Sequence, residues 1–237
     1  LAMLESHREA VDGSDPLSGR LVSLYMQLGR YEDVLSVLTT HRFHSWEGRY
    51  GIHRYWIQCR IKLGDMAFEQ GNYEEALGHY VQAMEYPDNL EAREQPGTIH
   101  ARKRFKIGRT LSALGKKRDA RAMFELVLTD NPPHGNPYSY YQGLALQELG
   151  KHNLAREKFQ RMLYELNQEP DHPESGPQSH DNEDGGTEIR KALLHFTRAL
   201  ALKGLGKTSD AAREMESALE LNPEVELRSF APPAAGW

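Results

Sequence analysis

Apolar residues recur at intervals of three and four along most of the chain, which is the spacing of one face of an α-helix. Short polar turns that carry a glycine interrupt this pattern. Five of the turns share one signal, and they read LGRYEDVL (28–35), QGNYEEAL (70–77), LGKKRDAR (114–121), LGKHNLAR (149–156) and LGKTSDAA (205–212). Because an amphipathic stretch precedes and follows each signal, we predict a repeated unit of helix, tight turn and helix.

The glycine of each signal is expected at the end of the first helix, where a positive φ is needed. Three further glycines, Gly64, Gly108 and Gly143, fall inside predicted helices, where glycine costs about 1 kcal/mol relative to alanine. We interpret them as close contacts, since two helices approach closely only where side chains are short. The pattern therefore predicts an all-α protein of about five helix pairs.

The repeated unit resembles the tetratricopeptide repeat (TPR), a 34-residue helix hairpin that places small residues where its helices meet. The clearest matches lie in the second copy, and they are Gly64, Gly71, Tyr73, Ala76, Tyr80 and Ala83. The resemblance implies a right-handed helical-hairpin solenoid, in which each pair buries its apolar face against its neighbours.

Insertions separate the repeats, because three of the four spacings between equivalent positions exceed 34 residues by eight or more. The turn inside each repeat keeps its length, so the insertions are expected to project from one edge of the solenoid. The predicted divisions are an N-terminal helical segment (1–20), the solenoid (21–223) with insertions at about 41–51 and 87–98 and a mobile acidic loop at 168–187, and a C-terminal tail (224–237). The start at Leu1, directly in a helical pattern, indicates a fragment of a longer protein.

The composition is that of an ordinary soluble protein, with 39% hydrophobic residues, 27% charged residues and a net charge of -5. This acidity argues against nucleic acid as a partner, and no run of about 18 apolar residues indicates a membrane span. The single cysteine, Cys59, excludes an internal disulfide and a cysteine-based zinc site. We expect a cytoplasmic protein that is not an enzyme and has no cofactor or metal ion, since no phosphate-binding loop or nucleophile motif is recognisable.

One segment departs from the overall acidity, because residues 95–118 contain eight Lys or Arg and no Asp or Glu. In the repeat frame, side chains of this segment line the inner groove next to aromatic residues. The predicted groove residues are Lys62, Asp65, Arg102, Phe105, Lys106, Arg109, Tyr140 and Tyr141. Such a groove suits an acidic peptide or a C-terminal carboxylate. A solvated charged face accounts for the same run equally well, and in a third hypothesis the acidic loop 169–184 folds across the basic surface and shields it.

The stretch HRFHSWEGRYGIHRYW (41–56) concentrates histidines and aromatic rings in the first insertion. His41, His44 and His53 could hold a metal ion together with Glu47, although His-x2-His alone is a weak zinc signal. Aromatic rings stack on sugars, so Trp46 beside Glu47 could form a sugar site, although glycoside hydrolysis needs a second carboxylate that the local sequence does not supply.

We favour a structural role for this stretch. Phe43 and Trp46 would fill the gap where the insertion leaves the helix packing, and Gly48 and Gly51 would permit the turn before a helix that begins near Ile52. A largely buried indole at position 46 would support this interpretation, whereas an exposed indole in a cleft would support the sugar site.

The motif FHSWEG, with EYPDNL (85–90) and YYQGLALQELGK (140–151), resembles the C-terminal repeat region of large bacterial proteins whose N-terminal half is a β-rich, galactose-mutarotase-like domain. The matching loop residues are His44, Trp46, Glu47, Gly48 and Gly51, whereas Arg49 and Tyr50 stand where that family has glycine and glutamate. The resemblance implies a saccharide-related parent protein.

We predict a non-catalytic interaction and scaffolding module. Its expected partner is a peptide, with acidic character, or a protein domain, including an N-terminal domain of the same parent chain. Binding would use the concave groove or the edge that bears the insertions. The alternative is the C-terminal part of a carbohydrate-active or carbohydrate-binding protein, in which His44, Trp46, Glu47 and Gly48 contribute to a sugar site.

Overall fold

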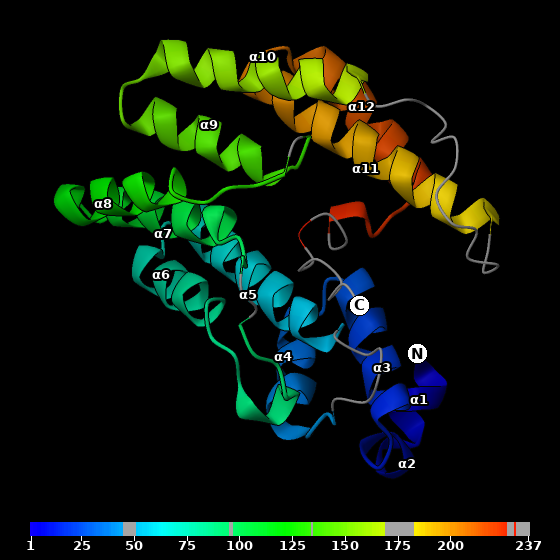
Figure 1. Ribbon diagram of the computed structural model, residues 1–237. Helices are drawn as coiled ribbons and strands as arrows, with labels where there is room; N and C mark the ends of the chain where they lie inside the picture. The colour runs from blue at the N-terminus through cyan, green and yellow to red at the C-terminus, as the bar shows by residue number, and fades with distance from the viewer. Residues whose placement is uncertain (45–50, 95–96, 134, 169–182, 227–229, 231–237) are drawn as a thin grey trace. The chain divides into compact units, whose positions relative to one another are not determined.

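The computed structural model describes residues 1–44, 51–94, 97–133, 135–168, 183–226 and 230 (Figure 1). Among these residues it contains helices and no strand. The helices are α1 (Ala2–Ser6), α2 (Arg8–Asp12), α3 (Asp15–Gln27), α4 (Tyr31–Thr40), α5 (Ile52–Glu69), α6 (Tyr73–Gln82), the 3-10 helix η1 (Asp88–Leu90), α7 (Ala101–Ala113), α8 (Lys117–Val127), α9 (Tyr138–Glu148), α10 (His152–Gln168), α11 (Glu183–Gly204) and α12 (Thr208–Leu221). The predicted all-α class is confirmed.

Five helix hairpins follow one another, from α3/α4 to α11/α12, and each one turns at a predicted glycine. The φ angles of these glycines are +69° at Gly29, +81° at Gly71 and +75° at Gly115, Gly150 and Gly206. The residue after each glycine donates its amide to a carbonyl five residues earlier, as Arg30 does to Tyr25 at 2.9 Å. This is the hydrogen bond that closes a helix end around a left-handed residue, so the predicted turns are confirmed.

The glycines inside the helices are points of close contact between the two helices of a hairpin, as predicted. A Cβ added to Gly64 would lie 2.5 Å from the ring of Tyr80, and one added to Gly108 would lie 2.7 Å from the ring of Phe124. Gly143 lies against the ring of Phe159 in the same way. Gly204 of the next hairpin lies against that ring too, and a Cβ added to Gly204 would lie 2.5 Å from it. Backbone and ring are therefore in direct contact, which no larger residue would permit.

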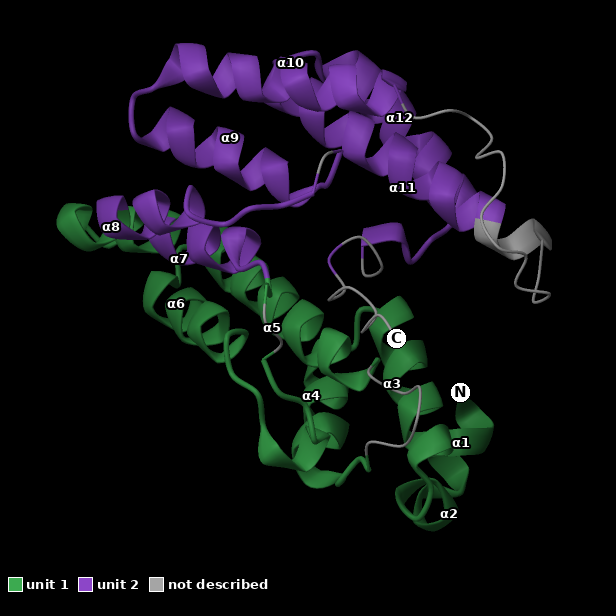
Figure 2. Cartoon of the chain, in the orientation of Figure 1, with its two compact units in different colours: residues 1–98, 109–120, 231–237 green, residues 99–108, 121–230 purple. Residues whose placement is uncertain are grey.

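The chain divides into two compact units, shown in Figure 2. Unit 1 comprises residues 1–98, 109–120 and 231–237, and unit 2 comprises residues 99–108 and 121–230. The boundary falls within helices α7 and α8, so the third hairpin contributes to both units. Each unit is described by itself below.

In unit 1, the hairpins α3/α4 and α5/α6 stack, with α5 in contact with both α3 and α4. Its core includes the fully buried side chains of Leu21, Val34, Leu38 and Ile61. The helices α1 and α2 precede α3, and the predicted boundary between residues 20 and 21 falls inside α3.

In unit 2, the hairpins α9/α10 and α11/α12 stack through α11, which contacts both α9 and α10. Phe159 lies at the centre of this core and is fully buried among Tyr140, Met162, Phe196 and further apolar side chains. Val225 and Phe230, which follow α12, belong to the same core.

The acidic third insertion is shorter than the sequence indicates. Helix α5 begins at Ile52 as predicted, and the second insertion contains η1. Helix α11 begins at Glu183, so residues 183–187 are helical rather than part of the acidic loop. Residues 169–182, which carry most of that loop, lie outside the described residues. None of the described helices is both long and apolar enough to span a bilayer.

Candidate peptide-binding surfaces

The residues of the predicted groove are divided between the two units. Unit 1 contains Lys62, Asp65 and Arg109, and unit 2 contains Arg102, Phe105, Lys106, Tyr140 and Tyr141. The predicted groove residues therefore form two separate sets, one in each unit.

Unit 2 contains an aromatic surface that holds the side chain of Phe230. The ring centroid of Phe230 lies 5.1 Å from that of Tyr138, 5.7 Å from that of Tyr141 and 5.9 Å from that of Phe196. The hydroxyl of Tyr138 also donates to the Phe230 carbonyl at 3.0 Å. Tyr138 and Tyr141 stand on α9 and Phe196 stands on α11, so two different hairpins hold one ring.

Arg102 on α7 completes this surface. Its guanidinium carbon lies 4.3 Å from the centroid of the Phe230 ring, and its Nη2 donates to Oε1 of Glu226 at 2.5 Å. The side chain of Arg102 is only 3% exposed, whereas that of Glu226 is 34% exposed. We expected Arg102 to line an open groove and residues 224–237 to form a tail. In the structure, Glu226 and Phe230 of that expected tail cover Arg102, because they supply a carboxylate and a ring to an otherwise costly buried cation.

The other groove residues of unit 2 contribute more to packing than to an open surface. Phe105 is 5% exposed, and its ring lies 5.7 Å from that of Phe124 and 5.9 Å from that of Tyr141. Tyr140 is 7% exposed and lies 5.8 Å from the ring of Phe159. Lys106 is half-buried. Among the predicted aromatic residues, Tyr141 also reaches Phe230.

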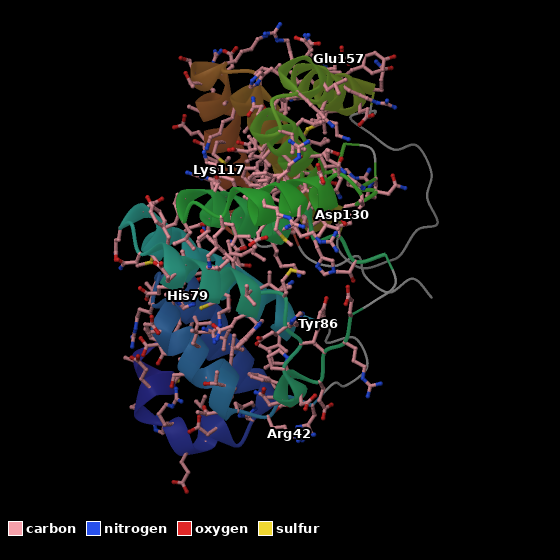
Figure 3. The ribbon with its side chains drawn as sticks, turned by 90° about the vertical axis from the view of Figure 1, so that its left-hand side faces the viewer. Arg42, His79, Tyr86, Lys117, Asp130 and Glu157 are labelled. Carbon is pink, nitrogen blue, oxygen red and sulfur yellow. The ribbon has the colours of Figure 1, made fainter. Side chains whose placement is uncertain are left out.

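A second acid neutralises the basic segment in unit 2, and sequence reasoning missed it. Asp130, labelled in Figure 3, accepts from Nη1 of Arg104 at 2.7 Å and from the amide of His100 at 2.9 Å. Its own carbonyl accepts from Nε2 of Gln142 at 2.7 Å. Asp130 follows α8 in the sequence, and nothing in the charge pattern of the basic segment indicates this contact.

In unit 1, Arg109 is the exposed cation of the predicted set. Its guanidinium carbon lies 4.5 Å from the ring centroid of Phe68, which is half-buried on α5. Asp65 accepts a hydrogen bond from the hydroxyl of Tyr80 at 2.6 Å, and Lys62 is half-buried. Arg109 and Phe68 thus present a charge and an aromatic edge to solvent.

Residues 41–44 of the first insertion form hydrogen bonds with α3 and with the second insertion. The imidazole rings of His41 and His44 hydrogen-bond to the carboxylate of Asp15 at 2.7 Å and 3.2 Å. The same carboxylate accepts from the His44 amide at 2.8 Å. Burial raises the pKa of Asp15, but these hydrogen bonds together lower it by more than burial raises it. The pKa of Asp15 therefore lies below its ordinary value. Phe43 is buried, and its amide donates to the Asn89 carbonyl at 2.8 Å. Trp46, Glu47 and Gly48 lie outside the described residues, so the question of a buried or exposed indole stays open.

The third histidine of the stretch is occupied elsewhere. Nε2 of His53 bonds to the Glu85 carbonyl at 2.8 Å, and its ring stacks on that of Tyr86 with centroids 4.4 Å apart. Tyr86 is labelled in Figure 3. Trp56 is 4% exposed and donates to the Gln82 carbonyl at 2.9 Å. In the part of the chain that the structure describes, no three His, Cys, Asp or Glu side chains converge as metal ligands.

Cys59 is a buried thiol in α5. Its Sγ donates to the Tyr31 carbonyl at 3.2 Å, and burial raises its pKa to about 12. A thiol of this pKa is almost entirely protonated at neutral pH, so it is a poor nucleophile.

These observations define a helix-hairpin repeat protein. Residues 105–170 match the family model of the tetratricopeptide repeat, which covers α8, α9, α10 and part of α7. The chain is similar to the crystal structure of MamA protein at 14% identity, over 93% of this chain and 98% of that chain, with a TM-score of 0.35. It is also similar to YrrB, whose structure is described as that of a TPR protein with an unusual peptide-binding site, at 14% identity over 71% of this chain and 88% of that chain, with a TM-score of 0.28. These TM-scores are too low to carry an argument, so the class rests on the repeat match and on the hairpins themselves.

Proposed function

We propose that this chain is a non-catalytic interaction module that binds a peptide or a partner protein. The observation that supports this proposal most is the surface of unit 2 around Arg102, Tyr138 and Phe196, because it holds a carboxylate and an aromatic ring from outside the hairpins. Tyrosine and arginine are the residues that most often contribute the binding energy of protein interfaces. Repeated helix hairpins also offer surface that is not needed to close a core.

The exposed Arg109 over the half-buried ring of Phe68 supports a second contact area on unit 1. A cation over an aromatic ring at a solvent-exposed site contributes about 0.5–1 kcal/mol, so this pair is available to a ligand at little structural cost. An acidic peptide would suit Arg109, as the basic composition of residues 95–118 indicates.

The sugar-site alternative receives no support from the described part of the first insertion. His44 bonds to Asp15 through both its amide and its ring, which is a structural contact between the insertion and α3.

A peptide-display selection against the purified chain tests the proposed function. We expect selected peptides to bind in solution with dissociation constants in the micromolar range, measured by calorimetry, and to protect amides of α7, α9 or α5 from hydrogen exchange. Selected peptides that fail to bind in solution at millimolar concentration would contradict the proposal. A ligand that binds to the Arg102→Ala and Arg109→Ala chains as tightly as to the wild-type chain would contradict the assignment of these two surfaces.

A further inference from the structure

The C-terminal segment that follows α12 has contacts unlike those expected of a tail. Helix α12 ends at Leu221, Val225 is 1% exposed and Phe230 is 7% exposed. Phe230 and Glu226 meet residues of α7, α9 and α11, which belong to three successive hairpins. Two residues that follow the last hairpin thus contact helices of three successive hairpins.

The two anchors of this segment are chemically distinct. The carboxylate of Glu226 receives a charge-assisted hydrogen bond from Arg102, which is stronger than a bond between neutral groups. The ring of Phe230 lies between the guanidinium of Arg102 and the aromatic rings of α9 and α11. Arg102 therefore contacts both anchors, which are spaced in the sequence as Glu-x-x-x-Phe.

The two halves of this ion pair differ in exposure. Glu226 keeps a third of its side chain exposed although its partner Arg102 is almost completely buried. Solvent therefore reaches the acid, and an external carboxylate reaches Arg102 only when Glu226 moves away.

We propose that Glu226 and Phe230 act as an internal ligand of the surface on unit 2, and that the external partner is a protein segment with an acidic residue four positions before an aromatic residue. The partner displaces the internal ligand. This inference rests on the proposed function, since it names the chemistry of the partner. The internal ligand competes at the effective concentration of a short tether, about millimolar, so the closed surface binds external segments weakly.

Fluorescence anisotropy with one probe tests the inference on the 237-residue chain. The probe is a fluorescein-labelled, C-terminally amidated peptide of residues 222–230, NPEVELRSF. We expect Phe230→Ala and Glu226→Gln in the chain to tighten binding of this probe at least tenfold, because each change weakens the internal competitor. Glu226→Gln replaces only one heavy atom of a partly exposed side chain, so it keeps the test valid where Phe230→Ala perturbs folding, which circular dichroism reports.

Matched controls separate the anchors from general effects. Glu220→Gln removes an exposed carboxylate of α12 and should leave the affinity for the probe unchanged. Probe peptides in which the glutamate of position 226 is replaced by glutamine, or the phenylalanine of position 230 by alanine, should lose at least tenfold in affinity for the Glu226→Gln chain. Arg102→Met added to Glu226→Gln should abolish the gain.

The outcomes distinguish this inference from the proposed function. Equal affinity of the probe for the wild-type, Glu226→Gln and Phe230→Ala chains overturns the internal ligand. Peptides from the display selection that carry the Glu-x-x-x-aromatic spacing and bind the wild-type and Glu226→Gln chains equally well also overturn it, while the proposed function stands. Tight binding of the probe to the variants, with no peptide selected by display against either the wild-type or the Glu226→Gln chain, supports the internal ligand and contradicts the proposed function.

Discussion

Arg102 and Arg109 offer a comparison within one helix. They stand seven residues apart on α7, each lies over a phenylalanine ring, and the two distances to the ring centroid are nearly equal at 4.3 Å and 4.5 Å. Arg102 in unit 2 is 3% exposed and bonds to Glu226, whereas Arg109 in unit 1 is exposed. Two residues of the same type in the same repeat frame thus have opposite environments, because a segment more than a hundred positions away covers one of them.

The comparison teaches that a basic face on a repeat helix is not by itself an open binding site. A local pattern identifies which side chains share a face, and the rest of the chain decides which of them remain accessible. The following predictions test whether the two arginines differ as much in energy as in exposure.

The largest difference is expected between the two phenylalanine rings. Phe230→Ala should reduce the free energy of unfolding by about 3 kcal/mol, which is at the low end for a buried ring because the ring lies at the edge of its core. Phe68→Ala should reduce it by about 1 kcal/mol, because Phe68 is only half-buried. Urea unfolding followed by circular dichroism measures both, and equal losses would remove the energetic basis of the comparison.

A smaller difference is expected between the two arginines. Arg102→Met should cost about 2 kcal/mol, since it breaks a charge-assisted hydrogen bond to Glu226 and a contact with Phe230 in a buried setting. Arg109→Met should cost about 0.5 kcal/mol, as expected for an exposed cation over a ring. The same urea titration applies. If Arg109→Met were the more destabilising change, the assignment of buried and exposed roles would be wrong.

A pH effect is expected in unit 1 from Asp15. Its pKa is lower in the folded state than in the unfolded chain, so its contribution to stability is complete above about pH 4 and is lost as the pH falls through the folded value. Asp15→Asn should remove this part of the acid dependence of the thermal midpoint between about pH 5 and pH 2. Asp12→Asn is the control, because Asp12 forms only an exposed ion pair with Arg8. Identical acid profiles for wild type and Asp15→Asn would contradict the role of this carboxylate.

The smallest effect is expected at Cys59, which provides a label for unit 1 alone. With a buried thiol and a pKa of about 12, Cys59 should not react with a thiol reagent at pH 8 in the folded chain. It should react within the mixing time in concentrated urea. Fast labelling of the folded wild-type chain, followed by absorbance, would show that α5 opens readily and that the burial of this thiol is not maintained.

Much of the fold could be predicted because its determinants are local. The five turn glycines are readable since a left-handed residue must end each first helix, and the start of α5 at Ile52 follows from the same periodicity. Gly64, Gly108 and Gly143 are readable since a glycine inside a helix needs a reason. The position of Gly204 against Phe159 was missed, because that contact joins two hairpins and has no counterpart in the pattern of a single repeat.

The candidate site was less predictable because it depends on contacts between distant positions. The repeat frame placed Arg102 and Tyr141 on one surface, which the structure brings together around Phe230. The frame could not place Glu226, Phe230 or Asp130 there, since all three lie outside the helices that carry the repeat pattern.

The sequence by itself determined the helices, the turns between them and the small residues at which the helices of a hairpin touch, because each depends on a few neighbouring residues and on the geometry of the α-helix. Only the tertiary structure decided which charged and aromatic side chains are covered. Burial of Arg102 depends on the balance between the cost of removing a cation from water and the contacts that Glu226 and Phe230 return, and that balance exists only when distant parts of the chain are brought together.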